Sequence, residues 1–430
     1  MAAYFEDSYR TLYNHDCRLM TELPDESVQM VVTSPPYWGL RKYAGPQDVA
    51  WSDGWRGAYG LESTPELYVQ HSVEILREIK RVLRKDGVVF WNIGDSYAGS
   101  WRGLNADGTD GGSEKKQLTN AGSINVTSSK RIPRGERRWG GGNNPATGTL
   151  KPKDLCLIPS RLAIAAQDNG WWVRSIIIWN KQNPMPESVT DRPTESHEYI
   201  IMLTKSAKYY WDAEAVKEDS LQPDRVRCDK INGNRPTQHS DGGVFMGSTG
   251  RNLRSVWTFA TQPYPEAHYA TFPETLPERC IKATTPEAGC CSKCGRPWTR
   301  VTEKTDVLPD SWKGSLFDDG KNLEVHPNTG KREDAHTEGG KVDNTKRLAL
   351  LRQQARENGG EYVNQTKTIG WEPSCKCAAP PTPSLVLDPF AGSGTTLFVA
   401  ARMGRNSVGY EISEEYCRLI VDRNRQHVLV

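Results

Sequence analysis

The sequence of 430 residues has no long apolar run and no large excess of charge of either sign. No stretch approaches the roughly 18 consecutive apolar residues that a membrane-spanning helix needs. The opening residues, MAAYFEDSYR, lack the basic segment and apolar run of a secretory signal. The formal net charge is only +2, so contacts with nucleic acid would have to come from local basic patches. We therefore expect a cytoplasmic protein that does not enter a membrane.

What is present is the pattern of an α/β fold. Gln29 to Val32 is a short apolar strand, and Thr64 caps a helix that has Pro65 in its first turn. Asp86-Gly87 is expected to end this helix, and Val88 to Ile93 forms the next buried strand. Near the other end of the chain, strand, glycine-rich turn, helix, strand and helix follow one another from Ser384. These units predict a doubly wound parallel sheet that both ends of the chain complete.

The strongest local motif is Thr33-Ser34-Pro35-Pro36-Tyr37-Trp38, directly after the first apolar strand. Two prolines fix φ and remove two backbone donors, so the turn is rigid. It can offer the Ser34 side chain and the Pro35 carbonyl as acceptors for an NH2 group, with Tyr37 as a stacking face. Two acceptors would hold an exocyclic amine with its lone pair aimed at an electrophile. The alternative, a plain proline-rich strand exit, explains fewer of these features.

The second motif is Asp388-Pro389-Phe390-Ala391-Gly392-Ser393-Gly394-Thr395-Thr396, between a strand and a helix. Its glycines let the backbone approach a ligand closely. The next strand ends at Glu411, where a carboxylate can bind ribose hydroxyls. The turn is not followed by GK[ST], which argues against a phosphate-binding P-loop.

These two motifs resemble the catalytic and cofactor motifs of the DNA amino-methyltransferases. The catalytic motif precedes the cofactor motif, an order similar to the permuted beta class of that family. The resemblance implies a Rossmann-like methyltransferase fold that binds S-adenosylmethionine. It also implies that Ser34, Pro35, Pro36 and Tyr37 are catalytic, and that Asp388, Phe390, Gly392, Gly394, Thr395, Thr396 and Glu411 bind the cofactor.

Further segments resemble this class. His15-Asp16-Cys17 is similar to its opening segment, which implies that Asp16 contacts the adenine of the cofactor. Phe272-Pro273-Glu274 is similar to the start of the helix that closes over the methionine moiety, so Phe272 and Pro273 join the expected cofactor site. His197-Glu198-Tyr199 resembles a segment between the catalytic motif and the target-recognition region.

The resemblance implies direct transfer of a methyl group from S-adenosylmethionine to the amine of a flipped base in double-stranded DNA. Serine before Pro-Pro-Tyr is more typical of N4-cytosine enzymes, and aspartate of N6-adenine enzymes, so we expect N4 of cytosine with N6 of adenine as the alternative. No Pro-Cys pair is present, which excludes the carbon-5 cytosine enzymes. An RNA amino-methyltransferase and an inactive DNA-binding protein remain as rivals. A cognate restriction endonuclease, a homodimer, and a bacterial or phage origin remain open.

The cysteines form a separate pattern. Cys291 and Cys294 have CxxC spacing, and Cys375 and Cys377 form a CxC pair shortly before the cofactor strand. Two such pairs can supply the four thiolates of a structural zinc site, without an open position for catalysis. Cys290 could replace Cys291, and unligated thiols are the alternative.

The insertions complete the expected organisation. Segment 97–154 is basic and rich in glycine and asparagine, and either a solvated loop or a loop that orders on a phosphate backbone fits it. The seven segments are 1–96 (catalytic half of the methyltransferase domain), 97–154 (basic insertion), 155–216 (domain continued), 217–255 (candidate target recognition), 256–289 (cofactor-closing helix), 290–378 (zinc-binding insertion) and 379–430 (cofactor-binding half).

Overall fold

The computed structural model describes residues 2–39, 47–98, 150–151, 153–184, 186–219, 250–262, 272–306 and 364–425. It contains two compact units. The first comprises Met1–Val216, Arg254–Thr299 and Pro373–Val430, and the second comprises Lys217–Leu253 and Arg300–Glu372. Most of the basic insertion and of the candidate target-recognition segment lies outside the described residues, so these two predictions stay open. All of the site described below belongs to the first unit.

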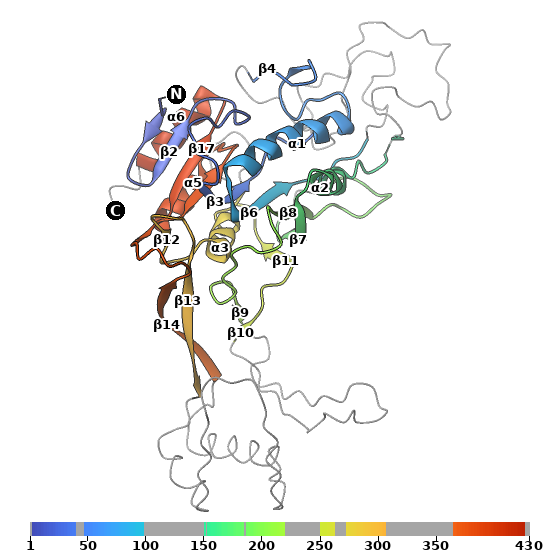
Figure 1. Cartoon of the computed structure of the whole chain (residues 1–430). Helices are drawn as coiled ribbons and strands as arrows, with labels where there is room; N and C mark the ends of the chain where they lie inside the picture. Colours follow the sequence, from blue (N-terminus) through green and yellow to red (C-terminus); the bar gives the residue numbers. More distant parts are fainter. Residues whose placement is uncertain are drawn as a thin grey trace, which may run out of the picture. The chain divides into compact units, whose positions relative to one another are not determined.

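The centre of the first unit is a nine-stranded sheet. Neighbouring strands run parallel from β2 (Arg10–Tyr13) to β6 (Leu83–Ile93), while β8 (His197–Thr204) is antiparallel to both of its neighbours. The two C-terminal strands lie between strands from the N-terminal part, as the red and blue arrows show (Figure 1). The predicted α/β sheet completed by both chain ends is therefore confirmed, but the sheet is mixed and not wholly parallel, because β1 (Phe5–Glu6) and β8 run antiparallel to their neighbours. In sheet order the strands are β1 (Phe5–Glu6), β2 (Arg10–Tyr13), β17 (Asn406–Tyr410), β16 (Leu385–Asp388), β3 (Val28–Thr33), β6 (Leu83–Ile93), β8 (His197–Thr204), β7 (Trp172–Lys181) and β11 (Val256–Phe259).

Helices pack against this sheet in pairs. The longest, α1, begins after Thr64, whose side chain accepts a hydrogen bond of 3.2 Å from the amide of Leu67. This cap satisfies one of the free amides of the first turn. Helix α1 packs on α2, and α3 packs on α5. The helices are α1 (Pro65–Val82), α2 (Ile158–Asp168), α3 (Thr275–Thr284), α5 (Thr395–Arg402) and α6 (Glu414–Arg425).

Among the described residues, the chain also forms four two-stranded sheets. They pair β4 (Val49–Ala50) with β5 (Arg56–Gly57), β9 (Glu218–Asp219) with β10 (Gly250–Arg251), β12 (Cys290–Cys291) with β15 (Pro381–Thr382), and β13 (Trp298–Asp306) with β14 (Asn364–Pro373). No helix in the described ranges is both long enough and apolar enough to cross a membrane.

One boundary differs from the sequence prediction. Helix α1 ends at Val82, and Asp86-Gly87 lies inside β6 instead of ending the helix. The strand begins at Leu83 because this residue already pairs with Val28, with a register shift before the regular ladder starts at Val88. Glycine fits there, since a Cβ at position 87 would lie 2.9 Å from the backbone carbonyl of Gln29 as well as 2.6 Å from the Leu83 side chain.

Candidate active site and cysteine cluster

The predicted site residues follow parallel strands at one edge of the sheet. Ser34 follows β3, Asp388 ends β16, Glu411 follows β17, and Asp16 lies shortly after β2. Strand β16 continues through α5 to β17 on one side, while β3 continues through α1 to β6 on the other. The gap between β16 and β3 is therefore the topological switch point at which open α/β sheets bind ligands.

Asp388 joins the two motifs. Its fully buried carboxylate accepts hydrogen bonds from the hydroxyls of Thr33 (2.7 Å) and Thr396 (2.6 Å) and from the amide of Phe390 (3.1 Å). Burial raises the pKa of Asp388 to about 7, against the opposing effect of these three donors. Asp388 and Thr396 therefore shape the turn, and both Asp388 oxygens are already occupied by the protein.

The glycine turn leaves room beside Glu411. Gly392 has φ +52°, and among the described residues a Cβ there would meet only the Phe390 carbonyl, at 3.8 Å. The half-buried carboxylate of Glu411 accepts hydrogen bonds of 2.9 Å from the amides of Gly392 and Ser413. Burial raises the pKa of Glu411 to about 7, and the nearby Asp388 adds to the rise. A glycine without steric neighbours next to an accessible carboxylate is a cradle that suits a ribose.

The end of this turn is held by Arg423, a residue that the sequence motifs did not indicate. Its guanidinium donates to the Ser393 carbonyl (3.1 Å) and to the Thr395 hydroxyl (3.0 Å). It also forms an ion pair of 3.3 Å with Glu274. Phe272 and Pro273 directly precede Glu274, so the segment expected to close over the cofactor is tied to the cofactor turn through Arg423. Gly394 has φ +76°, and a Cβ there would lie 3.0 Å from Ile420 of α6.

Aromatic packing supports the catalytic turn. The Tyr68 hydroxyl donates a hydrogen bond of 3.0 Å to the Pro36 carbonyl. Tyr68 stacks on Tyr59, with ring centroids 4.9 Å apart, and Tyr59 stacks on Phe390 at 5.6 Å. Phe390 therefore contributes to a column of rings between the two motifs.

A polar network surrounds Ser34 and Tyr37. The Tyr37 hydroxyl donates to Glu198 at 2.6 Å, and the Ser34 hydroxyl donates to the Tyr37 oxygen at 3.2 Å. Nδ2 of the buried Asn92 donates to Tyr37 (2.8 Å) and to Glu198 (3.0 Å), while its Oδ1 has no partner among the described residues. Lys181 forms an ion pair with Glu198. The side chains of Glu198 and Lys181 are 15% and 21% exposed, so the network reaches solvent at this end.

Asp16, the residue expected to contact the adenine, has a partner in the protein. The Arg18 guanidinium donates to both of its carboxylate oxygens, at 3.1 Å to Oδ1 and at 2.8 and 2.5 Å to Oδ2. Arg18 also forms an ion pair of 3.2 Å with Glu74 and lies 4.3 Å from the centroid of the Trp51 ring. The contact between Asp16 and the adenine stays a prediction, and Arg18 would hold the carboxylate in place for it.

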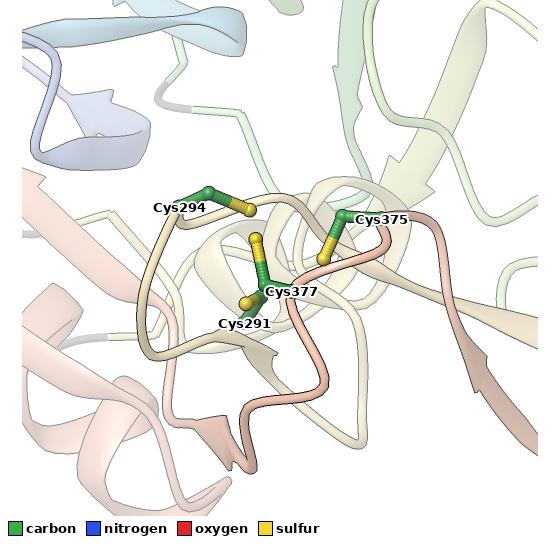
Figure 2. A group of neighbouring side chains, drawn as sticks. All are labelled: Cys291, Cys294, Cys375 and Cys377. Carbon is green, nitrogen blue, oxygen red and sulfur yellow. The ribbon is translucent and has the colours of Figure 1, made fainter.

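The four predicted metal ligands meet in space. The Sγ atoms of Cys291, Cys294, Cys375 and Cys377 all lie within 4.8 Å of one another. In Figure 2, Cys291 at the end of β12 and Cys294 on the following knuckle form one pair, and the other pair lies on the loop after β14. Cys290 faces away from the cluster, with its Sγ 3.3 Å from the Ser384 hydroxyl. The structure thus brings Cys291, and not Cys290, into the group.

The chain is similar to known DNA methyltransferases. A family model described as DNA methylase, of the N6/N4 type, matches residues 28–292 and 376–422. The Type II methyltransferase M.Cfr9I of Citrobacter freundii is 41% identical over 276 residues, which are 64% of this chain and 72% of the relative. M.XycI of Xanthomonas campestris pv. cyanopsidis is 40% identical over 277 residues, with the same two coverages of 64% and 72%. M.SfiI of Streptomyces fimbriatus is 28% identical over 422 residues, 93% of this chain and 87% of the relative.

Proposed function

This chain belongs to the N6/N4 DNA methylase family, and we propose that within this family it methylates N4 of cytosine in double-stranded DNA. Membership makes it an S-adenosylmethionine-dependent DNA amino-methyltransferase with the corresponding α/β fold. When bound, the cofactor supplies a methyl group on a positively charged sulfur. The choice of base goes beyond family membership and is the proposal tested below.

The observation that supports amino-methyl transfer at this site is the hydrogen bond between Thr33 and Asp388. It places the turn that begins at Ser34 beside the turn that is suited to a cofactor, at the switch point of the sheet. Gly392 and Glu411 would hold the ribose, and Asp16, Phe272 and Pro273 would surround the rest of the cofactor. The target base would have to leave the duplex stack to reach Ser34 and Tyr37.

Serine at the first position of the tetrapeptide supports cytosine over adenine. Ser34 offers a neutral hydroxyl that still has an acceptor lone pair, because its own proton goes to Tyr37. The Pro35 carbonyl would be the second acceptor for the amine, since the Pro36 carbonyl is already occupied by Tyr68. The alternative target is N6 of adenine, which presents the same kind of amine.

The wider assignments rest on the relatives and belong to the proposal. The relatives are named Type II methyltransferases, which supports a role in a restriction-modification system and duplex DNA as the partner. A cognate endonuclease, a homodimer and a cytoplasmic location in a bacterial or phage-infected cell are consistent with that role. Target recognition by the basic 97–154 and 217–255 insertions completes the proposal.

Nucleoside analysis tests the choice of base. The full chain is expressed in a bacterial strain without DNA methyltransferases of its own, and digested genomic DNA is analysed by mass spectrometry. N4-methylcytosine above the empty-vector level is expected, while N6-methyladenine in its place would select the alternative. Methylation of purified RNA but not of duplex DNA would favour the RNA enzyme, and cofactor binding without any methylation would favour the inactive DNA-binding protein.

A further inference from the structure

We propose that Cys291, Cys294, Cys375 and Cys377 bind a structural Zn²⁺ ion at the base of the 295–374 insertion. Four sulfur atoms within 4.8 Å of one another are close to the arrangement around zinc, where Zn–S bonds of about 2.3 Å place neighbouring sulfurs about 3.8 Å apart. Cys291 is buried, while Cys375 and Cys377 are half-buried and Cys294 is exposed. Four thiolate ligands fill a tetrahedral zinc site and leave no position for a substrate.

The backbone around the cluster is already folded for ligation. The amide of Gly295 donates to the Cys291 carbonyl (2.7 Å), and the amide of Cys291 donates to the Arg296 carbonyl (2.8 Å). Gly295 has φ +67°, and a Cβ there would lie 1.8 Å from the guanidinium of Arg84 in β6. The positive φ of the tight knuckle favours glycine, and any larger residue would also displace the Arg84 side chain.

The position of the cluster separates it from the chemistry. Strand β12 pairs with β15, and β15 directly precedes the amino end of β16. Asp388 lies at the carboxyl end of β16, which is the opposite edge of the sheet. A metal here would join the two ends of the insertion and hold them next to the cofactor strand. Its contribution would therefore be to folding, because ligation is coupled to the folded arrangement of the thiolates.

Metal analysis of the full chain tests this proposal. Reduced protein purified without added metal should contain one zinc per chain, and replacement by Co²⁺ should give the absorption of thiolate-bound cobalt. Cys294→Ser should lower the metal content and the melting temperature together. Cys290→Ala is the matched control, because this neighbouring thiol faces Ser384 and should leave the metal content unchanged. The proposal would be overturned if folded wild-type protein contained no metal and the four thiols of the cluster all reacted with a thiol reagent.

A second inference concerns the proton that methyl transfer releases, and it rests on the proposed function. We infer that Ser34, Tyr37 and Glu198 form a one-way proton path from the target amine to solvent. As the amine nitrogen bonds to the methyl carbon, the carbon–sulfur bond breaks and its electron pair stays on sulfur. The nitrogen then carries one proton too many, and this proton must leave.

The direction of the path follows from the donors and acceptors available. The Glu198 carboxylate can only accept, so the Tyr37 hydroxyl donates its proton to Glu198 at 2.6 Å. The Tyr37 oxygen must then accept, and the Ser34 hydroxyl donates to it at 3.2 Å. Asn92 donates to Tyr37 and to Glu198, which is compatible with this direction. Its Nδ2 also lies 3.4 Å from the Ser34 oxygen and takes one of the two lone pairs there. A lone pair of Ser34 is left to take the proton of the amine.

Each transfer in the path moves one proton by one hydrogen bond. The amine proton goes to Ser34, the Ser34 proton to Tyr37, and the Tyr37 proton to Oε2 of Glu198. Lys181 stabilises the ionised carboxylate between turnovers through its ion pair with Oε1. Because this end of the network is partly exposed, Glu198 can return the proton to water. Glu198 is thus the final proton acceptor, acting on the base through Tyr37.

Single-turnover methylation of unmethylated genomic DNA tests the path. Glu198→Gln keeps the shape of the side chain but cannot accept the proton, so the rate constant should fall by about 100-fold. Formate should partly restore the rate of Glu198→Ala. Glu414→Gln, an exposed carboxylate paired with Arg418, is the matched control and should behave like the wild type.

The outcomes distinguish failure of the proposed function from failure of the proton path. Absence of methylation by the wild-type protein would contradict the proposed function, and the path with it. Normal methylation by the wild type together with a rate within twofold in Glu198→Gln would overturn the path alone. A slow Glu198→Ala whose rate formate does not restore would also overturn it, since the variant would then act through structure only.

Discussion

The hydroxyl of Thr33 at the end of β3 donates a hydrogen bond of 2.7 Å to Oδ1 of Asp388 at the end of β16, which lies 355 residues later in the chain. Both residues are fully buried. The bond adds a side-chain link at the ends of two strands that already pair in the sheet, where one carries the catalytic turn and the other the cofactor turn. Asp388 is therefore a structural link between the two motifs as well as part of one of them.

Thr33→Val should break this link with little change of volume. Asp388 would lose one of its three donors in a buried site, which costs about 1–3 kcal/mol of unfolding free energy. We also expect weaker cofactor binding, because the turn after Asp388 loses support. Thermal unfolding and calorimetric titration with S-adenosylmethionine measure the two effects. Thr284→Val is the control: its buried hydroxyl donates within α3 at 2.8 Å, and cofactor affinity should stay normal. Unchanged affinity in Thr33→Val would contradict the proposed coupling.

Ser34→Ala should slow methyl transfer without loss of cofactor. Removing one well-placed acceptor for the amine should lower the single-turnover rate constant by about 100-fold. Calorimetry should show cofactor binding like that of the wild type, because Ser34 follows β3 and lies outside the glycine turn. Ser27→Ala, which removes an exposed hydroxyl bonded to the Pro24 carbonyl, should change neither measurement. A normal rate in Ser34→Ala would remove this serine from the catalytic group.

Contiguous motifs explain why much of the site was predictable from sequence. The Ser34-Pro35-Pro36-Tyr37 turn and the Asp388 turn each follow a strand directly in the sequence. In an α/β fold, turns after parallel strands lie at the carboxyl edge of the sheet, so the positions of both turns could be predicted. Asn92, Lys181 and Arg423 gave no such signal, because each is a single polar residue whose partners come from distant segments. Glu198 belongs to the His197-Glu198-Tyr199 segment, which the sequence did indicate, but its hydrogen bond to Tyr37 depends on the antiparallel register of β8.

The boundary at Asp86-Gly87 could not be predicted for a related reason. These residues are typical of a turn, but pairing of Leu83 with Val28 extends β6 through them. The four cysteines show the opposite case. Their spacing identified the pairs, and the fold then determined that Cys291 joins the cluster while Cys290 turns to Ser384.

Cofactor binding should depend on pH through Glu411. Its pKa of about 7 in the folded protein lies above the ordinary value of 4.5. The Glu411 carboxyl of the cofactor-free protein is therefore mostly protonated between these two pH values. Ribose hydroxyls donate to the ionised form, so affinity should rise from pH 5.5 to 7 by at most about tenfold per pH unit and level off above. Folding stability should change with pH in the opposite direction. The raised pKa of Glu411 contributes stability that is fully present below about pH 4.5 and is lost as pH rises through about 7.

Calorimetry in buffers of different ionisation enthalpy measures this coupling. At pH 6.5, binding of S-adenosylmethionine should release protons, and Glu411→Gln should abolish both the release and the pH dependence. Glu415→Gln changes a carboxylate on the outer side of α6 and should keep both. The same proton release in Glu411→Gln would assign the titration to Asp388, whose pKa is also raised to about 7.

Gly392→Val should prevent cofactor binding by filling the space beside Glu411. Gly392 has φ +52° and no close neighbour at the Cβ position, so a branched side chain would point into room that the protein leaves open for the ligand. Backbone strain at positive φ also costs stability, and Gly404→Val controls for it. Gly404 has φ +69° with nothing within 4 Å of its Cβ position, and it lies beyond the far end of α5. Both variants should melt at lower temperature, but only Gly392→Val should lose S-adenosylmethionine binding by calorimetry. Equal affinities in the two variants would show that the cofactor lies elsewhere.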